Sequence, residues 1–116
     1  MRRLASLLIV LAAAVGAAPH AHADPVGYVI NVTVRPGFGF GNADAALAYG
    51  YGICEQVHKG VAYSQNIAAV KRDLDTNDDY QATYLINQAV NELCPALIWH
   101  LRQSAAQKFP ASGGQE

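Results

Sequence analysis

Cys54 and Cys94 constrain the fold of this 116-residue chain more than any other feature, because they are its two cysteines. Each belongs to a segment whose apolar residues recur at helical spacing. A bond between them would hold two helices with their Cα atoms about 5.5–6 Å apart. Ala46 and Gly50 precede Cys54 at four-residue intervals and form a ridge of small residues that lets a second backbone come this close. Whether the thiols are oxidised depends on the compartment in which the chain folds.

Residues 1–23 have the three parts of a secretory signal peptide. Arg2 and Arg3 give a basic start, an uncharged apolar run extends from Leu4 to Ala18, and Ala21-His22-Ala23 is an A-x-A cleavage site. The apolar run is shorter than the roughly twenty residues that a membrane-spanning helix needs. We therefore predict cleavage after Ala23, a secreted or cell-envelope location, and no transmembrane segment in the remaining chain.

An even pair of cysteines in an oxidising compartment is expected to form a disulfide. The alternative is a zinc site, since His58 and His100 follow the two cysteines in the sequence. Structural zinc sites usually carry more closely spaced cysteines. The sequence therefore predicts a Cys54–Cys94 bridge, with no metal and no cofactor.

The exported part, residues 24–108, is expected to be a single all-α domain. Helical spacing predicts a helix over residues 42–59 that ends before Gly60. It also predicts a helix over residues 78–94, which carry an uninterrupted apolar face. A shorter helix is expected to follow Ser64, which would be its cap. We predict a small bundle of three to four short helices closed by one disulfide.

The segment over residues 25–35 has two interpretations. It is rich in β-branched residues, which favours a strand. The spacing of Val26, Val29, Ile30 and Thr33 instead fits the buried face of a helix. We favour the helix, because a lone strand has no evident partner in this chain.

Pro95 interrupts the helical pattern that leads to Cys94, since proline lacks an N–H group and its ring meets the preceding turn. Helical spacing resumes and continues to about Lys108. The sequence leaves open whether this last segment is a separate helix or a kinked continuation. Residues 109–116 are predicted to form a flexible C-terminal tail.

The acidic segment from Asp73 to Asp79 matches the first, third and fifth ligand positions of a calcium-binding helix-loop-helix. The match then fails, because Asp78 stands where glycine is required and Tyr84 stands in place of the bidentate glutamate. We interpret the segment as a solvated turn whose carboxylates lie near a helix N-terminus.

Charge and motifs exclude several functions. The chain has 8 Lys and Arg against 9 Asp and Glu, and no basic patch, so we expect no nucleic-acid partner. No G-x-S-x-G nucleophile motif occurs. We therefore predict a non-enzymatic, exported binding or interaction module, whose partner would be an envelope or extracellular protein or a small apolar ligand.

The aromatic residues are the candidates for such a surface, because exposed tyrosines favour binding. The candidate interaction surface comprises Phe38, Phe40, Tyr51, Tyr80 and Tyr84. Ordinary amphipathic packing, with each hydroxyl at the rim of the core, is the competing interpretation.

Two other functions stay open as alternatives. A small envelope hydrolase could use Glu55, Glu92 or His100 as acid or base. A structural component of the envelope could instead act by self-association.

Three motifs together resemble a known family: G-x-G-I-C from Gly50 to Cys54, the turn at Gly60, and A-V-x-x-x-C-P ending at Cys94-Pro95. The pattern is similar to the mycobacterial secreted domain-of-unknown-function family that is number 732 in its series. The resemblance covers roughly residues 37–95. It implies a small helical domain with bridged cysteines and an envelope or extracellular location, and it implies no established activity.

Overall fold

The computed structural model describes residues 22–108, which form five α-helices and one short 3-10 helix. In chain order these are α1 (Pro25–Val34), α2 (Ala43–His58), α3 (Tyr63–Asp73), α4 (Asp79–Leu93), η1 (Pro95–Leu97) and α5 (Ile98–Lys108). The predicted all-α class is confirmed for the described residues. The predicted count of three to four helices is too low by one, because α5 is a helix separate from α4. Most of the predicted signal peptide and the whole predicted tail lie outside the described residues.

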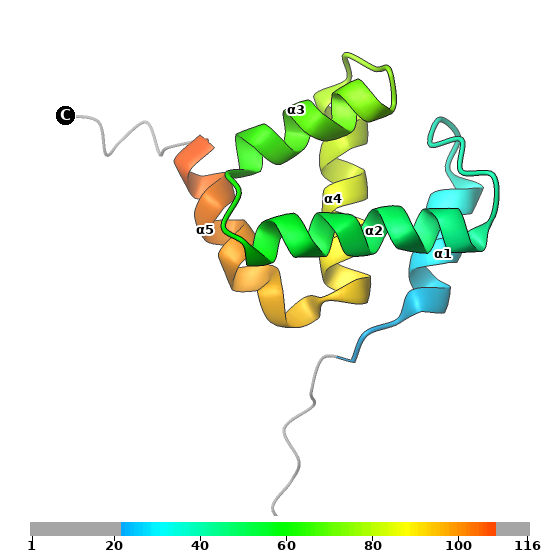
Figure 1. Cartoon of the computed structure of the whole chain (residues 1–116), viewed down its shortest axis with the longest axis horizontal. Coiled ribbons are helices and arrows are strands. Elements are labelled where there is room, and N and C mark those ends of the chain that lie inside the picture. Colours follow the sequence, from blue (N-terminus) through cyan, green and yellow to red (C-terminus); the bar gives the residue numbers. More distant parts are fainter. Residues whose placement is uncertain (1–21, 109–116) are drawn as a thin grey trace, which may run out of the picture.

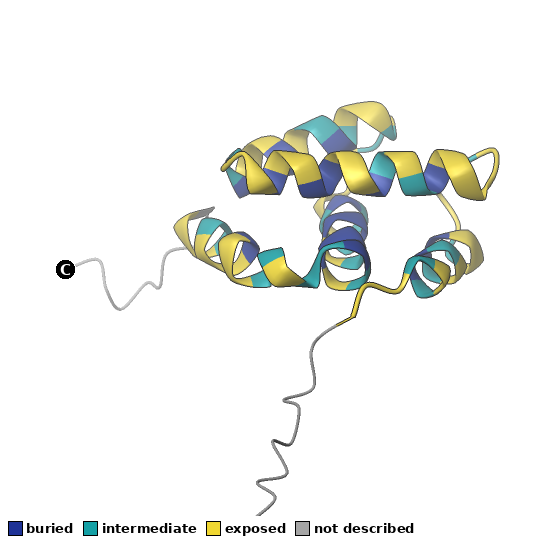
Figure 2. Ribbon diagram, turned by 60° about the horizontal axis from the view of Figure 1, so that its bottom comes forward, coloured by how far each residue is buried: buried dark blue, intermediate teal, exposed yellow. Residues whose placement is uncertain are grey.

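The helices form two layers (Figures 1 and 2). One layer contains α2 and α3, and the other contains α1, α4 and α5, with α4 in the middle. Helix α4 contacts every other helix, so it is the centre of the fold. Its predicted apolar face is confirmed, since it is buried throughout: Ala82, Leu85, Ile86, Ala89, Val90 and Leu93. Within residues 22–108, no helix is both long enough and apolar enough to cross a membrane.

Residues 25–34 are helical, which decides between the two interpretations of this segment. Asp24 caps α1 by accepting a hydrogen bond from the Gly27 N–H (2.8 Å), and Pro25 occupies the first helical position. The face predicted to be buried is wrong, however. Tyr28 and Val32 are buried, whereas Val26 and Ile30 are exposed.

Tyr28 explains this orientation of α1. Its ring is fully buried between α1, α2 and α4, and its hydroxyl donates a hydrogen bond to the Ala46 carbonyl of α2 (2.8 Å). A buried tyrosine hydroxyl needs such a partner. The hydrogen bond and the large buried ring therefore rotate α1 so that Tyr28 faces the core.

Because the Tyr28 hydroxyl is buried, we expect the free energy of unfolding to depend on pH in the alkaline range. Burial raises the pKa of its hydroxyl to about 12. Because the folded protein holds this proton more tightly than the unfolded chain, the contribution is present below pH 10 and is lost as pH rises towards 12. We expect the free energy of unfolding to fall by about 1.4 kcal/mol by pH 11 from this residue alone. Urea unfolding of wild type and Tyr28→Phe from pH 9 to 11 measures it. An equal pH slope in the two proteins would contradict the assignment.

The boundaries of α2 and α4 agree with those predicted from the sequence, whereas the start of α3 does not. Asn42 caps α2 through the Ala45 N–H (2.8 Å), and Gly60, with φ of +80°, follows its end as predicted. The predicted cap at Ser64 is wrong, because the N-cap of α3 is Ala62 and Ser64 is already the second residue of the helix. The N–H of Tyr63 donates to the Ser104 hydroxyl of α5 (2.7 Å). A side chain from a distant helix therefore takes the role of the local cap.

Pro95 ends α4 rather than kinking it. Cys94 leaves the helical region with φ of −142°, and Pro95 opens η1, after which α5 runs in a new direction (Figure 1). Helix α5 is thus a separate element, and it buries Leu101 against the core.

The predicted disulfide between Cys54 and Cys94 is confirmed, with a Cα–Cα distance of 6.1 Å. It links α2 to the end of α4. The small ridge on α2 has a further cause that the sequence did not indicate. A Cβ atom at Gly50 would lie 2.5 Å from Leu93 Cδ1 and 2.7 Å from Tyr28 Cζ. Gly50 thus makes room for Tyr28 as well as for α4.

Candidate functional site

The loop between α1 and α2 places two aromatic side chains beside the core. Gly37 and Gly39 have φ values of +109° and +66°, which residues with side chains rarely adopt. Between and after them, Phe38 is buried with 6% of its surface exposed, and Phe40 is half-buried. The alternating glycines therefore allow the short loop to turn both rings towards the helices.

These rings belong to a continuous aromatic row. Phe38 stacks against Tyr84 of α4, with ring centroids 6.0 Å apart, and against Phe40 at 6.4 Å. Phe40 in turn contacts Tyr49 of α2 at 5.5 Å. The row joins α4 to α2 beneath the loop, so it holds the loop in place. Phe38 lies too deep to contact a partner, which corrects its assignment to an interaction surface.

Arg35 contacts the aromatic row at its α4 end. Its guanidinium lies 4.0 Å from the Tyr84 ring centroid and 5.1 Å from that of Tyr80, which are cation–π distances. Tyr80 nevertheless keeps 64% of its surface exposed. Sequence reasoning missed Arg35. The available signal was the spacing of Tyr80 and Tyr84, one helical turn apart, which can hold a cation between the rings.

Tyr49 is the last ring of the aromatic row at its α2 end. Its hydroxyl donates a hydrogen bond to Asp73 at the end of α3 (2.9 Å). Burial, followed by the hydrogen bond to Asp73, raises the pKa of the Tyr49 hydroxyl well above its usual range. Tyr49 therefore acts as a neutral donor that ties α2 to α3.

Two open hollows flank the loop. One, of about 480 Å³, is lined by Arg35, Pro36, Gly37, Asp78 and Gln81. The other, of about 520 Å³, lies between the loop and α1 and includes Phe40 in its lining. The exposed Tyr80 ring, held by Arg35, therefore stands next to a polar hollow that offers donors and acceptors.

Tyr51 is not part of this arrangement. It follows Tyr49 by two residues on α2 and so lies about 200° around the helix from it. Its side chain is 47% exposed on that other flank. Of the five candidate residues, the structure brings together Phe38, Phe40, Tyr80 and Tyr84, and it adds Arg35 and Tyr49.

A comparison with known protein families identifies the family of this chain. The family model described as "Protein of unknown function (DUF732)" matches residues 22–96. The chain belongs to this family. No curated protein and no solved structure matches it. The DUF732 match spans α1 to α4 and both cysteines, so it contains the whole aromatic row. Helix α5 begins beyond it.

The three candidate acid–base residues occupy different settings in this DUF732 domain. Glu55 is exposed on α2 and pairs with Lys59 (3.5 Å). Glu92 is half-buried on α4. His100 lines a hollow of about 210 Å³ between α3 and α5, together with Tyr63 and Ser104. The Ser104 hydroxyl already accepts a hydrogen bond from the Tyr63 N–H, so its role is to cap the N-terminus of α3.

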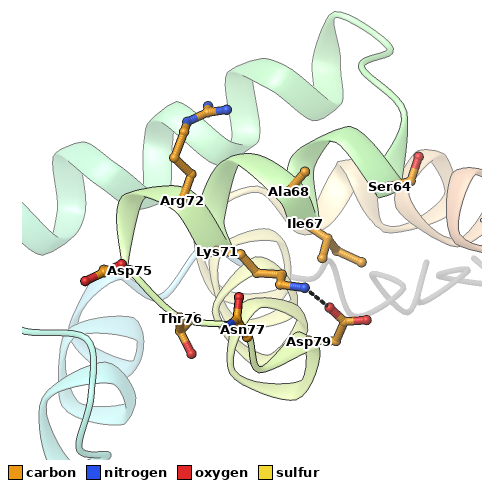
Figure 3. Close-up of a pocket in the computed structure, with 9 residues that line it drawn as sticks. All are labelled: Ser64, Ile67, Ala68, Lys71, Arg72, Asp75, Thr76, Asn77 and Asp79. Carbon is orange, nitrogen blue, oxygen red and sulfur yellow. Dashed lines mark hydrogen bonds and ion pairs between the residues drawn. The ribbon is translucent and has the colours of Figure 1, made fainter.

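The acidic turn of the DUF732 domain borders a hollow of about 540 Å³ (Figure 3). Lys71 reaches across it to Asp79, with Nζ and Oδ1 2.7 Å apart. Asp73 accepts from Tyr49, and Asp78 accepts from the Tyr80 N–H (2.9 Å). These carboxylates therefore serve contacts within the protein, and a cation at the turn would compete with the Lys71 ammonium for Asp79.

Proposed function

We propose that this DUF732 domain is a non-enzymatic, exported binding module that contacts an envelope or extracellular protein. Its contact surface would be the loop face, which comprises Arg35, Phe40, Asp78, Tyr80 and Gln81. The observation that carries the proposal is the exposed Tyr80 ring, held by Arg35 at the edge of a polar hollow.

The support behind Tyr80 favours binding over simple packing. Arg35 contacts both Tyr80 and Tyr84, and Tyr84 stacks on the buried Phe38. An exposed ring that is already ordered loses little conformational entropy when a partner covers it. Tyrosine and arginine are also the residues most enriched at the energetic centres of protein interfaces.

The chemistry of the loop face fits a protein partner. Phe40 and Tyr80 supply apolar area, Arg35 supplies hydrogen-bond donors, and Asp78 and Gln81 supply acceptors. Small apolar ligands are usually enclosed in clefts that cover most of their surface. The hollows here are open and partly polar, which favours the protein partner over the small apolar ligand.

Two features support the exported location. The basic start, apolar run and A-x-A site of residues 1–23 are those of a secretory signal. The Cys54–Cys94 disulfide is typical of chains that fold in an oxidising compartment.

Site-specific photocrosslinking tests the proposal in cells that export the full chain. A benzophenone amino acid at position 80 should capture a distinct protein, whereas the same group at position 51 should not. Tyr51 is the matched control because it is also an exposed tyrosine, but it lacks the support of Arg35.

Binding of the captured protein should then weaken about tenfold or more in Tyr80→Ala and in Arg35→Ala, as expected for central interface residues. Tyr51→Ala should leave the affinity within about twofold, the range of a residue outside the interface. Equal capture from both positions, or equal affinity of the Tyr80 and Tyr51 variants, would contradict the proposed surface.

A further inference from the structure

Helix α1 presents a row of bare aliphatic side chains to solvent. Val26 is 68% exposed, Ile30 53% and Val34 75%. Because these residues are four apart, they lie along one side of the helix, opposite the buried Tyr28 and Val32. We call Val26, Ile30 and Val34 the α1 ridge. Figure 1 shows α1 at one edge of the molecule, on the side away from α5.

Helix α1 itself carries no charge between Asp24 and Arg35. The ten residues from Pro25 to Val34 include no acidic or basic side chain. Thr33 is exposed as well, but its hydroxyl donates to the Val29 carbonyl (2.6 Å), which occupies its donor within the helix. The exposed side of a surface helix is ordinarily polar. Here it is apolar and β-branched, although such residues lower helix propensity.

We propose that the α1 ridge is the contact between two copies of this chain, with the two α1 helices antiparallel about Ile30. The ridge is symmetric around that residue, with one valine four positions before it and one four positions after. A two-fold axis would therefore place Ile30 against Ile30 and Val26 against Val34 of the second copy. Rows of this four-residue spacing are the ridges that interlock when helices pack, and an isologous contact requires such self-complementarity.

Charge selects the antiparallel arrangement. Asp24 precedes α1 and Arg35 follows it, so the two ends of the helix carry opposite charges. In an antiparallel pair, Asp24 of each copy approaches the end that carries Arg35 in the other. The two helix dipoles are then also opposed, which is the favourable arrangement. A parallel pair would bring like charges and like helix ends together.

A membrane surface fits the α1 ridge less well than a second copy does. Helices that lie on membranes typically carry Lys or Arg around their apolar side. Helix α1 has neither within its ten residues. Its absence of charge suits a contact in which the same surface meets itself.

The area of the α1 ridge sets the strength of the contact. Three aliphatic side chains exposed to this extent offer on the order of 300 Å² per copy, against about 800 Å² per partner in a standard interface. The dimer should therefore be weak, with a Kd of about 0.1–1 mM. This inference does not rest on binding at the loop face: Arg35 adjoins both surfaces, but the contact itself is made by Val26, Ile30 and Val34.

Sedimentation equilibrium of the exported, oxidised protein tests the contact up to about 1 mM, the range of the expected Kd. The average mass of wild type should rise towards that of a dimer with concentration. Ile30→Lys places two like charges on the two-fold axis and should raise the Kd at least tenfold. Tyr51→Lys is the matched control, since it adds the same charge at another exposed apolar position, and it should leave the Kd within about twofold.

Paramagnetic labelling tests the arrangement. A spin label on Val34→Cys, mixed with isotope-labelled wild type, should broaden the amide signals around Val26 more than those around Val34. A monomer at the highest concentration, an unchanged Kd in Ile30→Lys, or broadening around Val34 would overturn the proposal. Shifts of α1 signals on phosphatidylcholine vesicles, without a rise in mass, would replace it with a lipid surface.

Discussion

Removing the Cys54–Cys94 disulfide is expected to lower the free energy of unfolding by about 4 kcal/mol. The bond joins residues separated by 40 positions, and the closed loop contains α3 and the whole of α4. Breaking it lets the unfolded chain explore many more conformations, which stabilises the unfolded state. A domain of this size has a total stability of about 5–15 kcal/mol, so the loss would be a large share of it.

The suitable variant is the double replacement Cys54→Ala/Cys94→Ala, because either single replacement would leave a reactive thiol. Cys54 is buried and lies beside Ala89 of α4, so an alanine fits the site without crowding. Urea unfolding of this variant and of oxidised and reduced wild type gives the three free energies. The variant and the reduced protein should agree within about 1 kcal/mol. A variant as stable as the oxidised protein would contradict the role given to the bridge.

The elements predicted correctly are those whose signals are local. The apolar face of α4 follows from the 3.6-residue period, and the end of α2 follows from Gly60, which has the left-handed conformation that glycine tolerates. The disulfide followed from the number of cysteines and the export signal. The two helix signals do not depend on a distant part of the chain, whereas the disulfide is a long-range contact that could be predicted because the chain has a single pair of cysteines.

The errors arose where a distant contact decides the local structure. The orientation of α1 depends on the hydrogen bond between Tyr28 and the Ala46 carbonyl, eighteen residues further along. The start of α3 depends on Ser104, which lies 41 residues after Tyr63. β-branched composition and a nearby serine could not reveal either contact, because tertiary packing overrides local propensity.

In the candidate site, too, the sequence predicted the residues with a local signal but not the contacts between distant segments. Aromatic composition drew attention to Phe40, Tyr80 and Tyr84, and these residues do lie along one face of the structure. The pairing of Tyr80 with Arg35 crosses from α4 to the end of α1, so only the fold reveals it. Tyr51 was grouped with them on residue type alone, and the fold separates it.

Replacing Gly50 and Gly52 by alanine is expected to change stability in opposite directions, although both glycines lie in α2. Alanine stabilises a helix interior by up to about 1 kcal/mol relative to glycine. At Gly52 a Cβ atom would meet nothing within 4 Å, so this helix-propensity gain should be realised. Gly52→Ala should therefore raise the free energy of unfolding by about 0.5–1 kcal/mol. The sequence offers no reason for glycine there, and the structure shows that an added methyl group has room.

At Gly50 the same methyl group would overlap Leu93 Cδ1 and the Tyr28 ring. The Tyr28 ring is fully buried and its hydroxyl is fixed by Ala46, so it cannot move away cheaply. Overpacking of this kind costs about 1–3 kcal/mol, which exceeds the helix-propensity gain. Gly50→Ala should thus destabilise the oxidised protein, and Gly50→Leu should do so more strongly. Urea unfolding of both alanine variants at neutral pH measures the two changes. If Gly50→Ala were as stabilising as Gly52→Ala, Tyr28 would not lie against α2 as described, and the reason for its buried hydrogen bond would be lost with it.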